Sequence, residues 1–415
     1  MDLTFLFIIS SKNINSITPF FSESLLRWFK MKIAILTHYF KSPDSRGDYI
    51  KRIAWGLEKK DHKVTVLVTG PWFDSQAVRS LANYKVFPFP KIVSRTPLIH
   101  EISLLPYLKE VLSFLSQYDV FCVETHSFMD FFLIFLIKQL YNKPCVFDHH
   151  GLTFSAYKKG IDKLSLLKYD AMFRFWLSFI QFDYIIVHSK YIREEIRQRY
   201  RINSEIIPHG VDLTRFNPSI SGNDVRNRLN IRDATVLLYV GRLEAHKGLQ
   251  WFLKALSLIR NERKDIKIKA MIVGSGRERK NLETFAKRLN VSEIVIFAGH
   301  VSEEELPSYY AASDIFVIPS LYEGFGLPIL EAQACGSPVI GSDCTAIAET
   351  IGLGGVVFEP NNEVSLKNEI LRLIDDKQTY KKLVEKSLEN VENYRWQHVI
   401  DRIERILRTA SNNDK

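Results

Sequence analysis

The chain has 415 residues, and 46% of them are hydrophobic, so it is long and apolar enough for two domains of ordinary size. The formal net charge of +9 lies entirely in residues 1–215, which hold 29 Lys and Arg against 20 Asp and Glu, but no nucleic-acid recognition motif accompanies it. The four cysteines have no CxxC spacing, which argues against a disulfide framework or a cysteine metal site and favours reduced thiols in the cytoplasm.

The first 30 residues differ from the rest of the chain. The run at 4–9 is apolar and of signal-peptide size, but Asp2 precedes it, no basic segment stands before it, and it is too short to span a bilayer. Because residues 31–36 have the pattern of a first β-strand, residues 1–30 are predicted to be an atypical N-terminal extension. A mis-assigned start or a peripheral segment would explain it, and a mobile tail is the alternative.

Strand and helix patterns alternate through the first half of the chain. The segment 128–141 is apolar but short and contains Asp130 and Lys138, so we expect a buried core helix rather than a membrane span. The alternation is the βαβ rhythm of a parallel sheet with helices on both faces. Strands are predicted at 32–37, 63–68, 120–124, 144–148 and 184–187, and a further helix at 50–60.

Aromatic residues accompany the basic charge of this half, above all in the segment YDAMFRFW at 169–176. Basic charge beside aromatic side chains predicts contact with an anionic membrane surface, here at the inner face of the membrane, or with a phosphate-bearing acceptor. The alternative is that the lysines only keep the surface soluble.

Two polar positions that follow strands are candidates for a ligand site, because open α/β sheets bind ligands at the carboxyl ends of their strands. Gly47 lies in the loop after the first predicted strand, and His150 follows the strand at 144–148, where its imidazole can face an interdomain cleft. An imidazole there can donate a hydrogen bond or shuttle a proton, although a structural turn role for His150 stays open. His126 is a weaker candidate of the same kind.

The second half repeats the alternation after a break at residues 205–217, where Pro208 and Gly210 interrupt regular structure. Gly274 and Gly276 directly follow one of its strands and form, by themselves, a weak phosphate-loop signal. Strands are predicted at 236–240, 269–273, 295–298, 315–318 and 338–341.

Two cations stand on the loop after the strand at 236–240. Gly241 ends this strand, and Arg242 and Lys247 follow before a helical pattern begins near Gly248. Two cations between a strand end and a helix N-terminus suit a diphosphate. Solvated loop side chains are the alternative.

Acidic and glycine residues occupy the stretch 319–349, where an ordinary core element would carry apolar ones. Glu323 and Glu331 bracket a Gly-Phe-Gly-Leu-Pro turn, Gly326 lets the backbone approach a ligand closely, and a helix is predicted over 327–335. The unsatisfied amides of its first turn suit an anionic group, and Glu331 can accept hydrogen bonds from a vicinal diol. A capped surface helix with solvated glutamates is the alternative.

Four segments carry a resemblance to a known family: GRLEAHKG, IVGSGRERKNLE, FAGHVSEEELPSYYAASDIFVIPS and EGFGLPILEAQACGSPVI. They resemble the C-terminal half of retaining nucleotide-sugar glycosyltransferases of the GT-B fold, glycosyltransferase family 4. The resemblance implies an α/β fold with two Rossmann-like, doubly wound parallel-sheet domains facing an interdomain cleft. Residues 31–205 would be the acceptor-binding domain, 206–390 the nucleotide-sugar-binding domain, and 391–415 a helix crossing back to the first domain and a tail.

The resemblance also implies roles for single residues. Arg242 and Lys247 would hold the donor diphosphate, Glu331 the ribose hydroxyls, and Glu323 and His150 would lie against the transferred sugar. The chain departs from the family in having one glycine of the usual pair near its first strand and His209 where asparagine is common. The nucleotide-binding set implied is Gly47, Gly241, Arg242, Lys247, Gly274, Gly276, Gly326, Leu327 and Glu331; the catalytic set is Glu323, His150, Arg242 and Lys247.

The expected function is transfer of a hexosyl unit, with retention, from a nucleoside-diphosphate sugar to an acceptor hydroxyl, on a lipid-linked glycan or polysaccharide precursor. No D-x-D pair occurs and no His/Asp cluster has metal-ligand spacing, so we expect neither a metal nor a cofactor. An epimerase or phosphorylase could share the architecture, and a non-catalytic protein that binds a nucleotide sugar or glycan is the alternative from another class. A basic membrane-surface adaptor would explain the charge but not the acidic, glycine-rich stretch.

Overall fold

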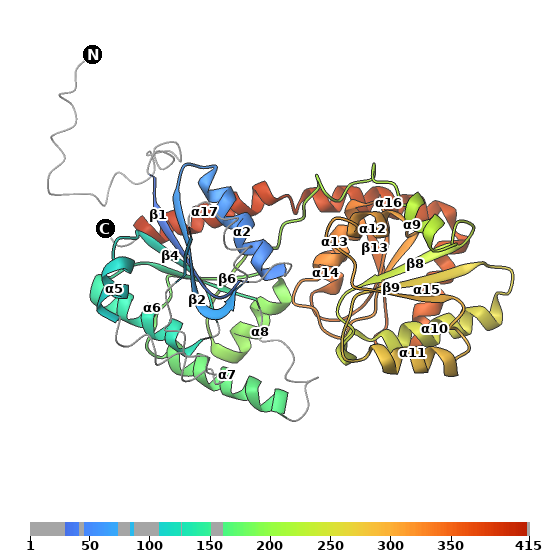
Figure 1. Cartoon of the computed structure of the whole chain (residues 1–415), viewed down its shortest axis with the longest axis horizontal. Coiled ribbons are helices and arrows are strands. Elements are labelled where there is room, and N and C mark those ends of the chain that lie inside the picture. The colour runs from blue at the N-terminus through green and yellow to red at the C-terminus, as the bar shows by residue number, and fades with distance from the viewer. Residues whose placement is uncertain are drawn as a thin grey trace, which may run out of the picture.

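The structure of the protein is a computed structural model that describes residues 30–40, 45–73, 84–86, 108–125, 127–150 and 161–412. Residues 1–29 of the extension predicted at 1–30 lie outside the described residues, as does the candidate His126. The described chain forms two α/β domains that lie side by side (Figure 1). Each is built on one parallel sheet, as the alternation of strands and helices predicts.

The first sheet has the strand order β3-β2-β1-β4-β5-β6-β7. Two inner strands, β4 and β5, are buried along their whole length, which explains the apolar residues with which their sequences begin. The strands are β1 (Lys32–Phe40), β2 (Lys63–Phe73), β3 (Tyr84–Val86), β4 (Val120–Glu124), β5 (Cys145–His149), β6 (Tyr184–Val187) and β7 (Glu205–Ile206).

Helices cover both faces of this sheet. One face packs on α2 (Ser45–Glu58) and on α17 (Trp396–Asn412), the last helix of the chain. The other packs on α5 (Leu108–Leu115), α6 (Phe128–Tyr141) and α7 (Ile161–Leu177). A further helix, α8 (Lys190–Tyr200), follows β6. The domain is therefore doubly wound.

The helix α6 is a core helix, as predicted. Its apolar side chains pack in the core, and Oδ2 of its buried Asp130 accepts a hydrogen bond from the Thr125 hydroxyl. Among the described residues, no helix combines the length and apolar character needed to cross a membrane.

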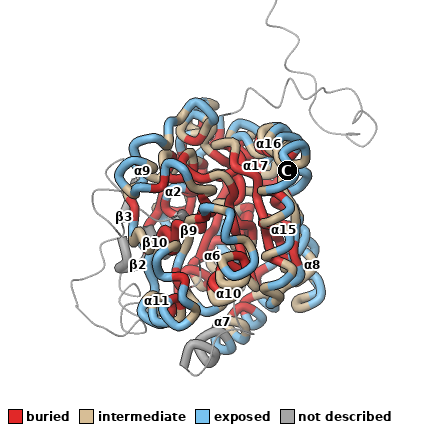
Figure 2. Tube along the Cα trace, turned by 90° about the vertical axis from the view of Figure 1, so that its right-hand side faces the viewer, coloured by how far each residue is buried: buried red, intermediate tan, exposed pale blue. Residues whose placement is uncertain are grey.

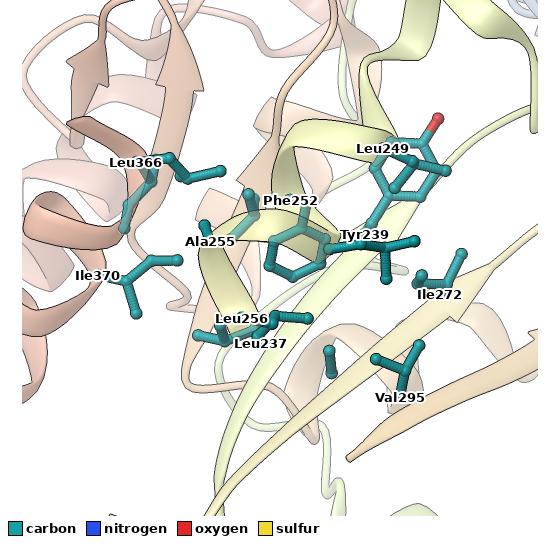
Figure 3. Packing of buried hydrophobic residues seen from close by; sticks show 14 of the residues in the cluster. Leu237, Tyr239, Leu249, Phe252, Ala255, Leu256, Ile272, Val295, Leu366 and Ile370 are labelled. Atoms are coloured by element: carbon teal, nitrogen blue, oxygen red, sulfur yellow. The ribbon is translucent and has the colours of Figure 1, made fainter. Parts of the chain in front are cut away.

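The second sheet has the order β10-β9-β8-β11-β12-β13. One of its faces packs on α10 and α15, and Figure 3 shows Phe252 and Leu256 of α10 between the strands and Leu366 and Ile370 of α15. The strands are β8 (Thr235–Val240), β9 (Ile268–Val273), β10 (Val295–Gly299), β11 (Ile315–Ile318), β12 (Val339–Ser342) and β13 (Gly355–Phe358). The helices are α9 (Asn223–Arg228), α10 (Leu249–Glu262), α11 (Arg279–Arg288), α12 (Leu306–Ala311), α13 (Leu327–Ala334), α14 (Ile347–Ile351), α15 (Glu363–Asp375) and α16 (Lys377–Glu392), with a short 3₁₀ turn at Ala245–Lys247.

The chain crosses between the domains twice, and the two crossings touch. The backbone N–H of Val211 donates to the carbonyl of Tyr394 at 2.8 Å, and a side chain at Gly210 would overlap the ring of Trp396. The helix α17 then completes the core of the first domain, where Ile403 and Leu407 are fully buried. In Figure 2 the buried segments gather in the sheets and on the inner sides of the helices.

Several predicted boundaries differ from the structure. The division at 205/206 falls inside β7, whose Ile206 pairs with Val187 of β6, and the division at 390/391 falls inside α16, because the helix continues to Glu392. Gly47 lies in the first turn of α2 rather than in a loop, since that helix begins at Ser45.

The aromatic segment at 169–176 is divided between core and surface. Phe173 and Trp176 are buried against α6 and β5, so these two rings are not available for the predicted membrane contact. Phe175 is about half exposed, at 49%, and its ring packs at a tilt against that of Phe179, which is 52% exposed. Helical spacing explains the difference. Phe173 and Trp176 are three residues apart and share one face of the helix, whereas Phe175 lies between them and points away from that face.

Candidate active site

The carboxyl ends of the two sheets face each other across a cleft and are in direct contact. The Ser189 hydroxyl, just after β6, donates to the carbonyl of Gly324 at 2.8 Å. The backbone N–H of Lys190 donates to the Glu349 carboxylate at 2.8 and 3.1 Å. A Cβ on Gly324 would come within 3.4 Å of the carbonyl of His150. The glycine-rich turn of the second domain therefore touches the strand end that carries His150.

An ion pair joins two of the predicted site residues. The Lys247 ammonium lies 2.6 Å from Glu323 Oε1, and both side chains are largely buried, at 12% and 15% exposure. Lys247 closes the 3₁₀ turn after β8, whereas Glu323 follows β11, the neighbouring strand. The predicted diphosphate cation and the predicted sugar carboxylate are thus brought together, and each compensates the other's charge.

Glu331 points from the first turns of α13 into a largely enclosed position. Its Oε2 accepts a hydrogen bond of 2.6 Å from the Tyr310 hydroxyl. Burial raises the pKa of Glu331 to about 7, and the Tyr310 hydrogen bond lowers it only in part. The carboxyl group therefore titrates near neutral pH, where a hydroxyl-bearing ligand can shift it to the ionised, stronger acceptor.

Arg242 is exposed at the end of β8, on a loop whose backbone is fixed by its neighbours. The Tyr239 hydroxyl donates to the carbonyl of Arg242 at 3.0 Å. A Cβ on Gly274 would lie 1.9 Å from the carbonyl oxygen of Gly241, and one on Gly276 would lie 2.2 Å from that of Leu243. These glycines are thus needed where two strand-end loops pack on each other, and they fix the position of the loop that carries Arg242.

The turn before α13 has the backbone that the glycine pattern predicts. Gly326 has a φ of +93°, in the left-handed region, and it directly precedes Leu327, the first residue of the helix. Leu327 is half-buried.

His150 lies in a cluster that sequence spacing did not reveal. Its Nε2 is 3.9 Å from Glu124 Oε1, and its ring lies beside those of His188 and His209. Strand ends that are far apart in sequence bring His150, His188 and His209 together with ring nitrogens close enough to hold a metal ion, which spacing along the sequence could not indicate.

Sequence reasoning missed Tyr310, Ser189 and Glu349. Tyr310 orients Glu331, while Ser189 and Glu349 hold the two strand-end regions together. Ser189 could have been found from its position just after a strand, and Tyr310 from its place in one of the resemblance segments.

Two Rossmann-like domains with strand ends facing across a cleft define the GT-B fold. The family described as Glycosyltransferase Family 4 matches residues 47–215, and that described as Glycosyl transferases group 1 matches residues 223–390. The chain belongs to the glycosyltransferases of this family 4 type, and it is a glycosyltransferase.

Individual relatives agree with this assignment. An uncharacterized glycosyltransferase of Methanocaldococcus jannaschii is 27% identical, over 89% of this chain and 96% of that protein. The UDP-Gal:alpha-D-GlcNAc-diphosphoundecaprenol alpha-1,3-galactosyltransferase of Escherichia coli is 30% identical, over 68% of this chain and 74% of that protein. Among solved structures, Anabaena HepE in complex with UDP has a TM-score of 0.75 at 19% identity, covering 91% of this chain and 100% of that one.

Proposed function

We propose that this glycosyltransferase moves a hexosyl unit, with retention, from a nucleoside-diphosphate sugar to the hydroxyl of a lipid-linked glycan or polysaccharide precursor. The observation that carries the proposal is the Lys247–Glu323 pair at the strand ends of the second domain, where the adjoining Gly324 turn touches His150 of the first domain. The name of the Escherichia coli relative, which acts on a diphosphoundecaprenol-linked sugar, supports the donor and acceptor classes.

Each side chain has a role that its surroundings suit. Arg242, exposed and on a rigid loop, and Lys247 bind the diphosphate, and Glu331 accepts hydrogen bonds from the ribose hydroxyls. The Lys247 ammonium is already paired with Glu323, so a phosphate oxygen binds it in competition with that carboxylate. Glu323 then faces the transferred sugar, and His150 contacts that sugar from the first domain.

The reaction breaks the bond between C1 of the sugar and the diphosphate oxygen. Negative charge develops on the departing diphosphate, and Arg242, Lys247 and the amides at the start of α13 stabilise it without a divalent cation at that position. The acceptor oxygen attacks C1 from the same face, and its proton passes to the departing phosphate oxygen. Retention follows without a protein nucleophile. A covalent sugar adduct on Glu323 would instead indicate double displacement.

The basic first domain with its two outward rings, Phe175 and Phe179, suits peripheral contact with an anionic membrane surface, where a lipid-linked acceptor would be presented. Lys168 is exposed on the same helix, α7, as Phe175. We place the enzyme at the inner face of the membrane on this basis.

Release of nucleoside diphosphate from a panel of UDP-, GDP- and ADP-sugars tests the function without knowledge of the acceptor. One donor should be hydrolysed slowly by the wild type. Lys247→Ala should reduce that rate at least about 100-fold, since the charge on the leaving group loses its partner. The matched control is Lys254→Ala, on the next helix and paired with Glu363, which should retain the wild-type rate. The proposal would be overturned if no donor in the panel were hydrolysed and none bound to the protein.

A further inference from the structure

Three imidazoles meet where the first domain joins the chain crossing to the second. His150 directly follows β5, His188 directly follows β6, and His209 lies three residues beyond β7. Because β5, β6 and β7 are neighbours in the sheet, their carboxyl ends place the three rings side by side. The ring centroids of His188 lie 4.4 Å from that of His150 and 4.0 Å from that of His209.

The spacing of the ring nitrogens suits a metal ion. One nitrogen from each ring lies within 4.8 Å of the other two. Three atoms so spaced share a point about 2.8 Å from each, and a Zn–N bond is about 2.0–2.1 Å, so each ring needs to move by about 0.7 Å. Imidazole nitrogen is a preferred ligand of Zn²⁺, Cu²⁺, Ni²⁺ and Co²⁺.

The contacts of His188 require a cation beside it. Its Nδ1 lies 2.9 Å from the carbonyl oxygen of Ile207, which can only accept, so Nδ1 carries the hydrogen. In the neutral ring, Nε2 then has a lone pair, yet it lies 3.1 Å from Asp148 Oδ1. Two lone pairs at that distance repel unless a proton or a metal ion binds there. The Nδ1–H bond to a backbone carbonyl is the contact that commonly orients a metal-ligating histidine.

Two buried carboxylates add negative charge to the cluster. Asp148 and Glu124 are 3% and 4% exposed. Asp148 Oδ2 accepts a hydrogen bond of 2.7 Å from the Tyr49 hydroxyl, and Glu124 Oε2 accepts one of 2.8 Å from the Thr37 hydroxyl. Two carboxylates held in place beside three imidazoles favour a divalent cation over an array of neutral rings.

We propose that His150, His188 and His209 bind a divalent transition metal ion such as Zn²⁺, and that the bound ion inhibits sugar transfer by withdrawing His150 from the cleft. The inhibition, but not the binding, rests on the proposed function of His150. The three rings belong to strand ends of the first domain, whereas Arg242 and Lys247 belong to the second, so the proposed ion is bound by other residues than those that would hold the diphosphate.

Calorimetric titration of untagged, chelator-treated protein with Zn²⁺ tests the site directly. The wild type should bind one ion with a micromolar or lower Kd. His209→Asn and His188→Gln should each weaken binding at least tenfold, whereas His300→Gln, an exposed histidine outside the cluster, should leave it unchanged. With Co²⁺ in place of Zn²⁺, the wild type should show the strong visible absorption of a four- or five-coordinate ion, and His209→Asn should lose it.

The inhibition is measured as the ratio of donor turnover with and without Zn²⁺ within each protein. The wild type should be inhibited at the concentration at which the ion binds, and His209→Asn should need at least tenfold more. The metal site would be disproved if the wild type bound no Zn²⁺ at millimolar concentration, or if His209→Asn bound Zn²⁺ as tightly as the wild type. A proton between His188 and Asp148 would then account for their contact. Binding without any metal-free turnover of a donor would instead count against the proposed function alone.

Discussion

At the scale of single residues, the Lys247–Glu323 ion pair determines the charge that a ligand meets in the cleft. The pair is nearly neutral as a unit, largely buried, and held at 2.6 Å. If Lys247 holds the donor diphosphate, as we propose, the diphosphate competes with Glu323 for the ammonium, and donor binding rearranges charge that is already present.

This competition leads to a prediction for Glu323→Gln. The substitution keeps the shape of the side chain but frees the ammonium of Lys247, so the nucleoside diphosphate should bind about five- to tenfold more tightly, or about 1 to 1.4 kcal/mol. Donor turnover should fall at the same time, because the sugar loses its carboxylate. Calorimetry and product release measure the two effects, and weaker diphosphate binding by the variant would contradict the competition.

Glu331 gives a prediction in pH. Its pKa of about 7 in the folded chain lies above its ordinary value of 4.5, so the unfolded chain ionises first, and the free energy of unfolding should fall as the pH rises from about 4.5 to about 7. Ribose hydroxyls need the ionised acceptor, so nucleotide affinity should rise through pH 7 and level off above it. Glu331→Gln should remove both dependences relative to the wild type, as measured by denaturation and by nucleotide titration. Identical pH profiles for the two proteins would disprove this role.

At the scale of the elements, the loops that follow β8 and β9 support each other through glycines. The backbone N–H of Leu243 donates to the carbonyl of Ser275 at 2.9 Å, and Gly274 stands against Gly241 with no room for a side chain. The close packing of these two loops sets where Arg242 lies relative to the cleft.

Comparison of two glycine substitutions tests that packing. Gly336→Ala places a Cβ in open space at a φ of +84°, so it should cost only the left-handed backbone penalty of about 1–2 kcal/mol. Gly274→Ala adds an overlap with backbone at 1.9 Å, so it should lower the unfolding free energy by clearly more and weaken nucleotide binding as well. Urea denaturation and nucleotide titration provide the readouts. An equal loss of unfolding free energy in the two variants would contradict the close packing of these loops, because the extra Cβ at residue 274 would then be accommodated at no additional free-energy cost.

At the scale of the whole molecule, α17 makes the first domain depend on the end of the chain. Ile403 and Leu407 are fully buried, α17 packs against α2, β4 and β5, and a Cβ on Gly56 of α2 would lie 2.5 Å from Ile400 of α17. The two domains are thus joined by a packed helix as well as by the 207–211 crossing.

Truncation of one buried side chain of α17 should destabilise the whole first domain. Ile403→Ala should reduce the unfolding free energy by about 2–5 kcal/mol, because it leaves a cavity in that core. Arg405→Ala, on the same helix but outside the core cluster, is the control and should change it by less than about 0.5 kcal/mol. An Ile403→Ala variant as stable as this control would show that α17 only rests on the surface.

Membrane contact also belongs to this scale. The wild type should sediment with vesicles of anionic lipid and less with neutral ones, and the double variant Phe175→Ser, Phe179→Ser should lose most of this binding, because it removes two half-exposed rings. Trp55→Ser, a substitution of another exposed ring of the first domain, is the control and should bind as the wild type does. Equal sedimentation of wild type and double variant would remove Phe175 and Phe179 from the membrane contact.

The sequence by itself determined the class of fold and the loops that carry the candidate site. Continuous apolar runs such as 120–124 predict buried parallel strands, and Gly326 before Leu327 predicts the left-handed turn before α13, because these features depend on local backbone preference and on periodicity. The resemblance supplied the family, which the comparisons confirm.

Only the tertiary structure decided which side chains meet. The Lys247–Glu323 pair and the cluster of His150, His188 and His209 join residues from different strand ends, and the Tyr310 hydroxyl on Glu331 joins the helices α12 and α13. The order of strands in a sheet is set by long-range packing, so no spacing within the sequence indicates which strand ends become neighbours. The short edge strand β7 was missed for the same reason, since only its pairing with β6 defines it as a strand.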